Sequence, residues 1–289
     1  MLSPLSSERA GSSVAGGARP ARSPRSLKQE YQEFILQRIE EYKNALPREE
    51  LLEIGDEAVR ELQATAQEQY LLTEVLLLEH VDRIISRRLR LPSFPRWRQK
   101  HRALREAQRE PTHWGLDHTH PIIPWAARLE AGDLVAVIGA AALPEALFLA
   151  AHDAQVFLVD QDLGAVEAAE GRAVTEQLAG AFQALVINYG SWFPDLSPAL
   201  VVIEPGSLAD LRARSRAALF AELQARTRSG GVHVVLPAAA SREVIPLAPE
   251  ALQTFYHGWQ VQRSRRSKRS GFIATKPPRQ LDTALNVSD

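Results

Sequence analysis

The chain has 289 residues, of which 45% are hydrophobic and 24% charged, and a formal net charge of −1. Such a length and composition are typical of one large or two ordinary globular domains. No apolar run approaches the roughly 20 residues of a membrane helix, and the absence of cysteine excludes disulfides, thiolate metal sites and a cysteine nucleophile. We therefore expect a cytoplasmic protein without a membrane partner.

The first 27 residues are rich in Ser, Gly, Pro, Ala and Arg and contain one acid, Glu8. A segment of this kind buries too little apolar surface to order itself, which predicts a disordered tail over residues 1–27. Its arginines and serines also resemble an organelle transit peptide, although its prolines and glycines disfavour the amphipathic helix of such peptides. A second tail is expected over residues 279–289.

Residues 28–110 have the periodicity of helices, with apolar residues recurring at spacings of three and four. Two helices are expected to begin near Lys28 and Pro47, and two more to span Glu68–Arg90 and Arg96–Glu110. Together they predict a small helical domain.

Charge is distributed unevenly in this helical region. Residues 28–82 contain 14 acidic and five basic residues, whereas Arg83–Arg105 contains nine Lys or Arg and no acid, with Phe94 and Trp97 interleaved. One interpretation is a nucleic-acid contact, in which arginines bind phosphates and aromatic rings stack on bases. The other is a solvated face, or a partner for the acidic helices that precede it.

A polar connector is expected over residues 111–130. Its notable side chains are His113, Trp114, Asp117, His118, His120 and Trp125. The two histidines of an H-x-H pair can ligate a metal through their imidazoles, but no further ligand is indicated, so histidines in a linker are the simpler interpretation and no metal is predicted. Alternatively, the connector folds over the mouth of the next domain, with its two tryptophans as a lid.

Strands and helices alternate over residues 131–278. The expected strands span Leu134–Ile138, Gln155–Asp160, Gln183–Asn188, Ala199–Glu204, Val232–Pro237, Trp259–Arg263 and Gly271–Lys276. Continuous β-branched runs favour strands buried on both faces, hence a parallel sheet covered by helices. The last two strands leave no room for a crossover helix and are expected to form an antiparallel hairpin. The predicted fold class is α/β, preceded by the helical region.

This succession of elements resembles a known fold. The order of elements resembles that of the class I S-adenosylmethionine-dependent methyltransferases. The resemblance rests on five parallel strand–helix units, on a Ser229-Gly-Gly turn before the fifth strand, and on a closing hairpin that ends in Gly271-Phe-Ile-Ala-Thr-Lys-Pro. The resemblance covers about Trp125–Pro278. It implies a Rossmann-like sheet, S-adenosylmethionine as cofactor and a methyltransferase activity.

The resemblance also implies a set of cofactor-binding residues. They are Gly139, Ala140, Ala141, Asp160, Gln161, Asn188 and Glu204. Gly139 matches the first glycine of the cofactor loop, Asp160 the acid that binds the ribose hydroxyls, and Asn188 a position near adenine. Glu204 closes the fourth strand, where catalytic and substrate-facing residues stand. All lie at carboxyl ends of strands, where open α/β sheets bind ligands.

The chain departs from the acid-x-Gly-x-Gly-x-Gly pattern of the family's loop. Val137 replaces the acid, and Ala141 and Leu143 replace the second and third glycines. A side chain at Ala141 narrows the approach of the backbone to a ligand, and a positive φ there would cost roughly 1–2 kcal/mol. The alternative function is therefore a catalytically inactive methyltransferase-fold module that acts in binding or assembly.

The methyl acceptor is open. One candidate is a small molecule enclosed by the helical region, and the other is RNA or DNA facing the basic segments Arg83–Arg105 and Arg263–Arg269. A basic hairpin tip also protects an edge strand from pairing with other chains, which is the alternative interpretation of the second segment.

Overall fold

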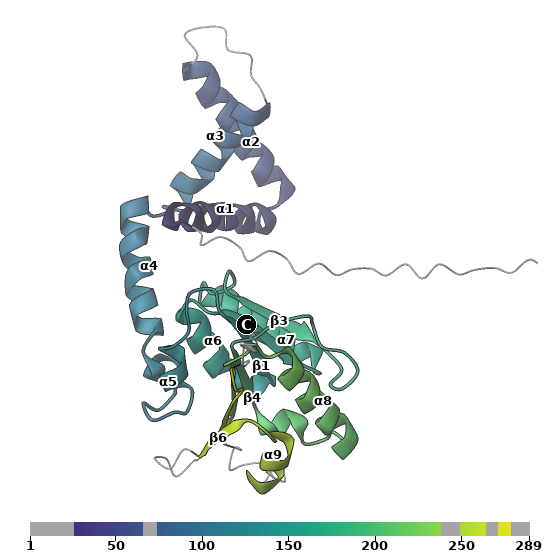
Figure 1. Cartoon of the computed structure of the whole chain (residues 1–289). Coiled ribbons are helices and arrows are strands. Elements are labelled where there is room, and N and C mark those ends of the chain that lie inside the picture. The colour runs from purple at the N-terminus through teal and green to yellow at the C-terminus, as the bar shows by residue number, and fades with distance from the viewer. Residues whose placement is uncertain (1–25, 66–73, 238–248, 264–270, 279–289) are drawn as a thin grey trace, which may run out of the picture. The chain divides into compact units, whose positions relative to one another are not determined.

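The computed structural model describes residues 26–65, 74–237, 249–263 and 271–278. These residues divide into two compact units, a helical unit up to Ala107 and an α/β unit from Gln108 onward (Figure 1). The tails expected at both ends lie outside the described residues, except for Ser26 and Leu27. Within the described ranges, no helix is both long and apolar enough to cross a membrane.

The helices of the helical unit are α1 (Leu27–Ala45), α2 (Arg48–Thr65), α3 (Glu74–Arg88) and α4 (Phe94–Gln108). Helix α1 begins with a capping box, in which Ser26 and Gln29 satisfy each other's backbone amides. The expected third helix is confirmed from Glu74 to Arg88, and its expected start lies outside the described residues. Helix α4 begins before Arg96, because Pro95 fits the first turn of a helix, where an amide has no intrahelical partner.

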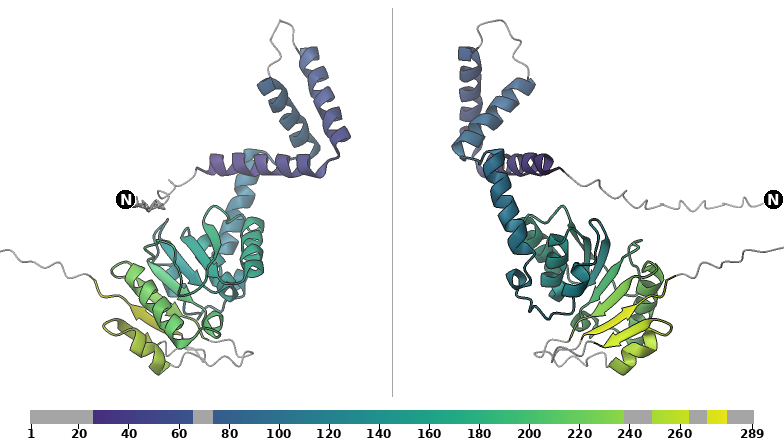
Figure 2. Two further views of the ribbon diagram at one scale, coloured as in Figure 1. Left: turned by 90° about the vertical axis from the view of Figure 1, so that its right-hand side faces the viewer. Right: turned by 60° about the vertical axis from the view of Figure 1, so that its left-hand side comes forward.

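A seven-stranded sheet forms the centre of the α/β unit, in the order β3-β2-β1-β4-β5-β7-β6. The strands are β1 (Leu134–Ile138), β2 (Gln155–Asp160), β3 (Phe182–Val186), β4 (Leu200–Ile203), β5 (Val232–Val235), β6 (Gln260–Arg263) and β7 (Phe272–Thr275). The first five are parallel, and β7 pairs antiparallel with both β5 and β6. The expected parallel sheet with a C-terminal antiparallel hairpin is confirmed, and this hairpin lies at the edge opposite β3 (Figure 2).

Helices and short turns cover both faces of this sheet. They are η1 (Pro111–Trp114), α5 (Ile123–Ala126), η2 (Ala140–Ala142), α6 (Leu143–Ala151), α7 (Leu163–Thr175), η3 (Pro205–Leu208), α8 (Ala213–Arg226) and α9 (Pro249–Phe255). One core joins alternate strand residues to α6 and α7, and a second joins the remaining strand residues to α8 and α9. Alternate residues thus face opposite layers, which explains why the strands read as continuous apolar runs.

The segment expected as a polar connector, residues 111–130, belongs to the first of these cores. Trp114, Leu116 and Ile122 are buried in it, and the indole Nε1 of Trp114 donates to the Gln108 carbonyl at 2.7 Å. The apolar residues of this segment are spaced too irregularly to signal a helix or strand, so the sequence did not indicate their burial. Trp114 therefore has a packing role.

A buried polar network connects β5 to the helices behind it. His233 is fully buried, and its Nε2 and Nδ1 lie 2.7 Å from the hydroxyls of Thr227 and Tyr256. Because the Thr227 hydroxyl donates to the Leu223 carbonyl, its oxygen accepts from Nε2, and Nδ1 accepts from Tyr256. Burial, reinforced by the positive charge of Lys276, lowers the pKa of His233 to about 3.

We expect this histidine to make the α/β unit sensitive to acid. Below pH 6.5, the ordinary pKa of histidine, His233 is protonated in the unfolded chain but stays neutral in the folded chain. The free energy of unfolding should therefore fall by about 1.4 kcal/mol for each pH unit of acidification. A His233→Gln variant lacks this term. Urea unfolding of both proteins between about pH 6.5 and pH 4 measures it. A difference in stability between the two proteins that does not change with pH would contradict the assignment.

Candidate functional site

The parallel strands bring three of the residues implied by the resemblance to one edge of the sheet. Ile138 of β1 is in register with Val159 of β2 and with Ile203 of β4. The residues that follow these three positions, Gly139, Asp160 and Glu204, therefore end adjacent strands at the carboxyl edge. The strand order reverses between β1 and β4, and such a switch point is where open α/β sheets bind ligands.

The loop after β1 is a tight turn that runs directly into a helix. Gly139 has a φ of +102°, and Ala140–Ala142 form the 3-10 turn η2, which leads into α6 at Leu143. None of the three alanines has a positive φ. The expected strain at Ala141 is thus absent, because a helical turn suits alanine, and the side chain of Ala141 points to solvent.

Gly139 is the position where a glycine is required. A Cβ atom there would lie 2.7 Å from Ser207 Oγ and 2.8 Å from Ser207 Cβ, and also 3.1 Å from Glu204 Cβ. The backbone after β1 therefore lies against the first turn after β4, with no room for a side chain between them. The glycine serves this contact within the chain.

Asp160 is tied to the same loop. Its Oδ2 accepts from the Ala140 amide at 2.6 Å, and its Oδ1 accepts from the Asp162 amide at 2.9 Å. An ionised carboxylate offers about four acceptor positions, so two remain on this half-exposed side chain. Asp162 caps α7 through the amides of Gly164 and Ala165, a role that its position before an apolar helix could have indicated.

Apolar side chains lie exposed on the β3 side of Asp160. Val186 is in register with Asp160 on the neighbouring strand and is 46% exposed. Leu163 at the start of α7 and Trp192 after β3 are also exposed. Gln161 and Asn188, both implied as cofactor residues, are solvent-exposed too. A carboxylate beside exposed apolar surface suits a ligand with a hydroxyl-bearing part and a flat apolar part.

Glu204 is engaged in its own turn. Its two carboxylate oxygens accept from the amides of Gly206 and Ser207 at 2.8 and 2.7 Å, which caps η3. The Ser207 hydroxyl donates to the Glu204 carbonyl. The side chain expected to face a substrate is thus held as a helix cap.

Tyr189 is a residue that the sequence interpretation missed. It follows β3 and is 3% exposed, and its hydroxyl donates to the Val159 carbonyl at 2.8 Å. Burial raises the pKa of its phenol well above the usual value, and the negative charges of Asp160 and Glu204 add to this effect. The phenol is therefore neutral. It lies among the carboxyl ends of β1, β2 and β4, in the crevice that the reversal of strand order leaves beside β1.

The connector histidines are dispersed. His113 Nε2 lies 3.6 Å from Glu176 and His120 Nε2 lies 3.2 Å from Glu145, so each contacts a different helix. His118 is exposed. Among the described residues, no three histidine, aspartate or glutamate side chains gather into a possible metal site.

Comparison with known proteins gives matches of fold. No family model matches the chain, and no curated protein sequence is similar to it. Among solved structures, the glycopeptide N-methyltransferase MtfA is 14% identical over 56% of this chain and 91% of its own, with a TM-score of 0.45. The N-methyltransferase NodS from Bradyrhizobium japonicum is 14% identical over 53% and 93%, with a TM-score of 0.43. The [4+2]-cyclase SpnF is 15% identical over 54% and 79%, with a TM-score of 0.45.

The strand order and directions define the fold of the C-terminal unit. Five parallel strands are followed by an antiparallel β7 inserted between β5 and β6, as the resemblance implied. The α/β unit has a class I methyltransferase-like fold.

The contact between Gly139 and Ser207 can be tested with two alanine variants. Gly132 also has a positive φ, +87°, but a Cβ there meets nothing within 4 Å. We expect Gly132→Ala to cost about 1–2 kcal/mol from φ strain alone, and Gly139→Ala to cost about 1–3 kcal/mol more, because the turn after β4 must move. Urea unfolding measures both. Equal costs would show that the two turns are not in close contact.

Proposed function

We propose that the α/β unit binds S-adenosylmethionine at this carboxyl edge and acts as a methyltransferase. The observation that carries the proposal is Asp160, a half-exposed carboxylate with acceptor positions to spare, placed beside exposed Val186. In this arrangement Asp160 would accept from the two ribose hydroxyls, and Val186 would contact the adenine. We place the activity in the cytoplasm as part of the same proposal, in keeping with a sequence without cysteine.

The residues present fit the nucleoside part of the cofactor better than its amino-acid part. Asp160, Gln161 and Asn188 are accessible to the nucleoside. The methionine part would lie in the crevice next to Gly139, which Tyr189 and Ser207 occupy. Tyr189 must therefore move aside before the methionine part enters. When bound, the cofactor supplies an already activated methyl group, so that the protein has only to orient it toward an acceptor.

The filled crevice favours a second candidate, a methyltransferase-fold module that binds or assembles without catalysis. In that case the hydrogen bond from Tyr189 to Val159 and the cap at Glu204 are permanent parts of the core. The two candidates differ in one property, the ability of the crevice to open.

An Asp160→Asn variant tests the nucleoside contact. Asparagine keeps the size of the side chain but loses the charge and half of the acceptors, so we expect its affinity for S-adenosylmethionine to fall at least about tenfold, since hydrogen bonds to a charged group are worth about 1.5–3 kcal/mol. Equilibrium dialysis with labelled cofactor measures it. Asp210→Asn, at an exposed site beyond η3, is the matched control. Equal binding by the two variants would remove Asp160 from the site.

A Tyr189→Phe variant tests whether the crevice opens. The lost hydrogen bond is worth about 1 kcal/mol and stabilises only the closed crevice. Its removal should therefore raise the fraction of open crevice, and with it the affinity for S-adenosylmethionine, about fivefold. The Val159 carbonyl still accepts from the Gly139 amide, so no buried acceptor is left unpaired. Tyr256→Phe removes another buried hydroxyl, the one bonded to His233, and should leave binding unchanged. If neither wild type nor Tyr189→Phe binds millimolar cofactor, the non-catalytic candidate holds.

A further inference from the structure

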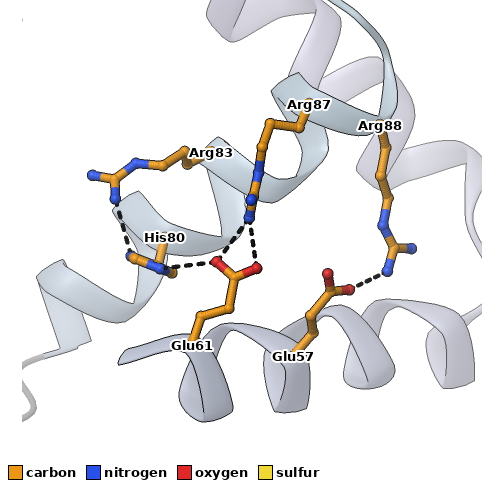
Figure 3. A network of polar contacts seen from close by, with 6 residues as sticks. All are labelled: Glu57, Glu61, His80, Arg83, Arg87 and Arg88. Atoms are coloured by element: carbon orange, nitrogen blue, oxygen red, sulfur yellow. Dashed lines mark hydrogen bonds and ion pairs between the residues drawn. The ribbon is translucent and has the colours of Figure 1, made fainter. Parts of the chain in front are cut away.

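The basic segment Arg83–Arg105 consists of two parts that differ in their ion pairing. In α3, Arg87 and Arg88 pair with carboxylates of α2, whereas Arg83 contacts His80 of its own helix (Figure 3). Arg87 Nη2 lies 2.8 and 2.7 Å from the two carboxylate oxygens of Glu61, and Arg88 pairs with Glu57. The hydrogen bond from Arg87 lowers the pKa of Glu61, in keeping with a stable charge pair. These two arginines act within the helical unit.

Four cations of α4 form no such ion pair with a carboxylate of the described residues. Arg96, Arg98, Lys100 and Arg102 are all exposed. No carboxylate of the described residues forms an ion pair with any of them. At 1.5 Å per residue, the i,i+4 pairs Arg96–Lys100 and Arg98–Arg102 each span about 6 Å along the helix. Because successive residues of a helix are rotated by about 100°, Arg96 and Lys100 lie on one flank of the exposed surface of α4, and Arg98 and Arg102 lie on the other flank.

The buried side of α4 is fixed against α1. Trp97 is 5% exposed, and its ring centroid lies 5.4 Å from that of Tyr31 and 6.2 Å from that of Phe34. His101 stacks on Trp97 and pairs with Glu30 of α1 at 3.1 Å. This packing leaves the two charged flanks of the helix exposed to solvent. It also withdraws Trp97 from the stacking on bases that the sequence interpretation assigned to it.

We propose that the exposed surface of α4 binds the phosphate backbone of a nucleic-acid duplex, through Arg96 and Lys100 on one flank and Arg98 and Arg102 on the other. Arginines on a rigid helix suit phosphate oxygens, which accept from their planar forks. With Trp97 buried and Phe94 packed against Tyr31 and Trp97, the contact reaches phosphates and no base edges, so it is independent of sequence. A membrane surface is disfavoured, because α4 has no free apolar side to insert between lipids. The inference does not depend on cofactor binding by the α/β unit.

Fluorescence anisotropy of a labelled 20-base-pair DNA duplex, titrated with the full chain at several salt concentrations, tests the proposal. If all four cations contact phosphates, log K should fall with log salt at a slope of about −3.6, and a duplex of different sequence should bind equally. Arg98→Gln/Arg102→Gln removes two contacts, so its slope should fall to about −1.8. Glutamine preserves helix propensity. The matched control is Arg212→Gln/Arg214→Gln, which removes two exposed charges of the α/β unit and should behave as wild type.

Several outcomes would overturn the proposal. The first is a lack of duplex binding at about 50 mM salt, where phosphate contacts are strong. The second is an unchanged slope of log K against log salt in Arg98→Gln/Arg102→Gln, which would place the contact elsewhere. Base-dependent affinity, or binding to phosphatidylserine vesicles or polyglutamate as tight as to the duplex, would also overturn it. Far-ultraviolet circular dichroism and thermal unfolding of each variant confirm that a loss of binding is not a loss of fold.

Discussion

The close approach of two turns at the carboxyl edge determines what the α/β unit can hold. Parallel pairing of β1 with β4 places Gly139 against Ser207 and Glu204, with no space for a Cβ atom. The cap formed by Glu204 fixes the second turn, and the amide of Ala140 fixes Asp160. Of the cofactor site that we propose, only the outer part, on the β2–β3 side, is therefore open unless Tyr189 leaves the crevice.

Much of this fold could be predicted from the sequence, because its strands are buried on both faces and read as unbroken apolar runs. The short spacing between the last two strands leaves no room for a crossover helix, which predicted the antiparallel hairpin. Asp160 could be placed because it ends the second strand, and the carboxyl ends of parallel strands meet at one edge of the sheet. Tyr189 could not be found in the same way, since a tyrosine in a loop gives no sign of folding back over three strand ends. The burial of Trp114 and Trp97 was also hidden, because it depends on contacts distant in sequence.

The loop after β1 shows why a motif has to be read through its backbone conformation. The alanines that replace glycines adopt a helical turn without positive φ, so their substitution costs no strain. The remaining obstacle to a ligand is the packing of Tyr189 and Ser207 against the loop. Loss of glycines and loss of the crevice are thus separate features. The exposed cations of α4 are a third feature, which belongs to the helical unit and does not depend on the crevice of the α/β unit.

Amide hydrogen exchange of the full chain, with and without saturating S-adenosylmethionine, tests the central claim most directly. The account predicts slowed exchange at residues 139–143, 160–165 and 186–192, where the loop after β1, the end of β2 and the segment after β3 would surround the cofactor. Slowed exchange confined to the helical unit, or exchange unchanged at millimolar cofactor, would contradict it.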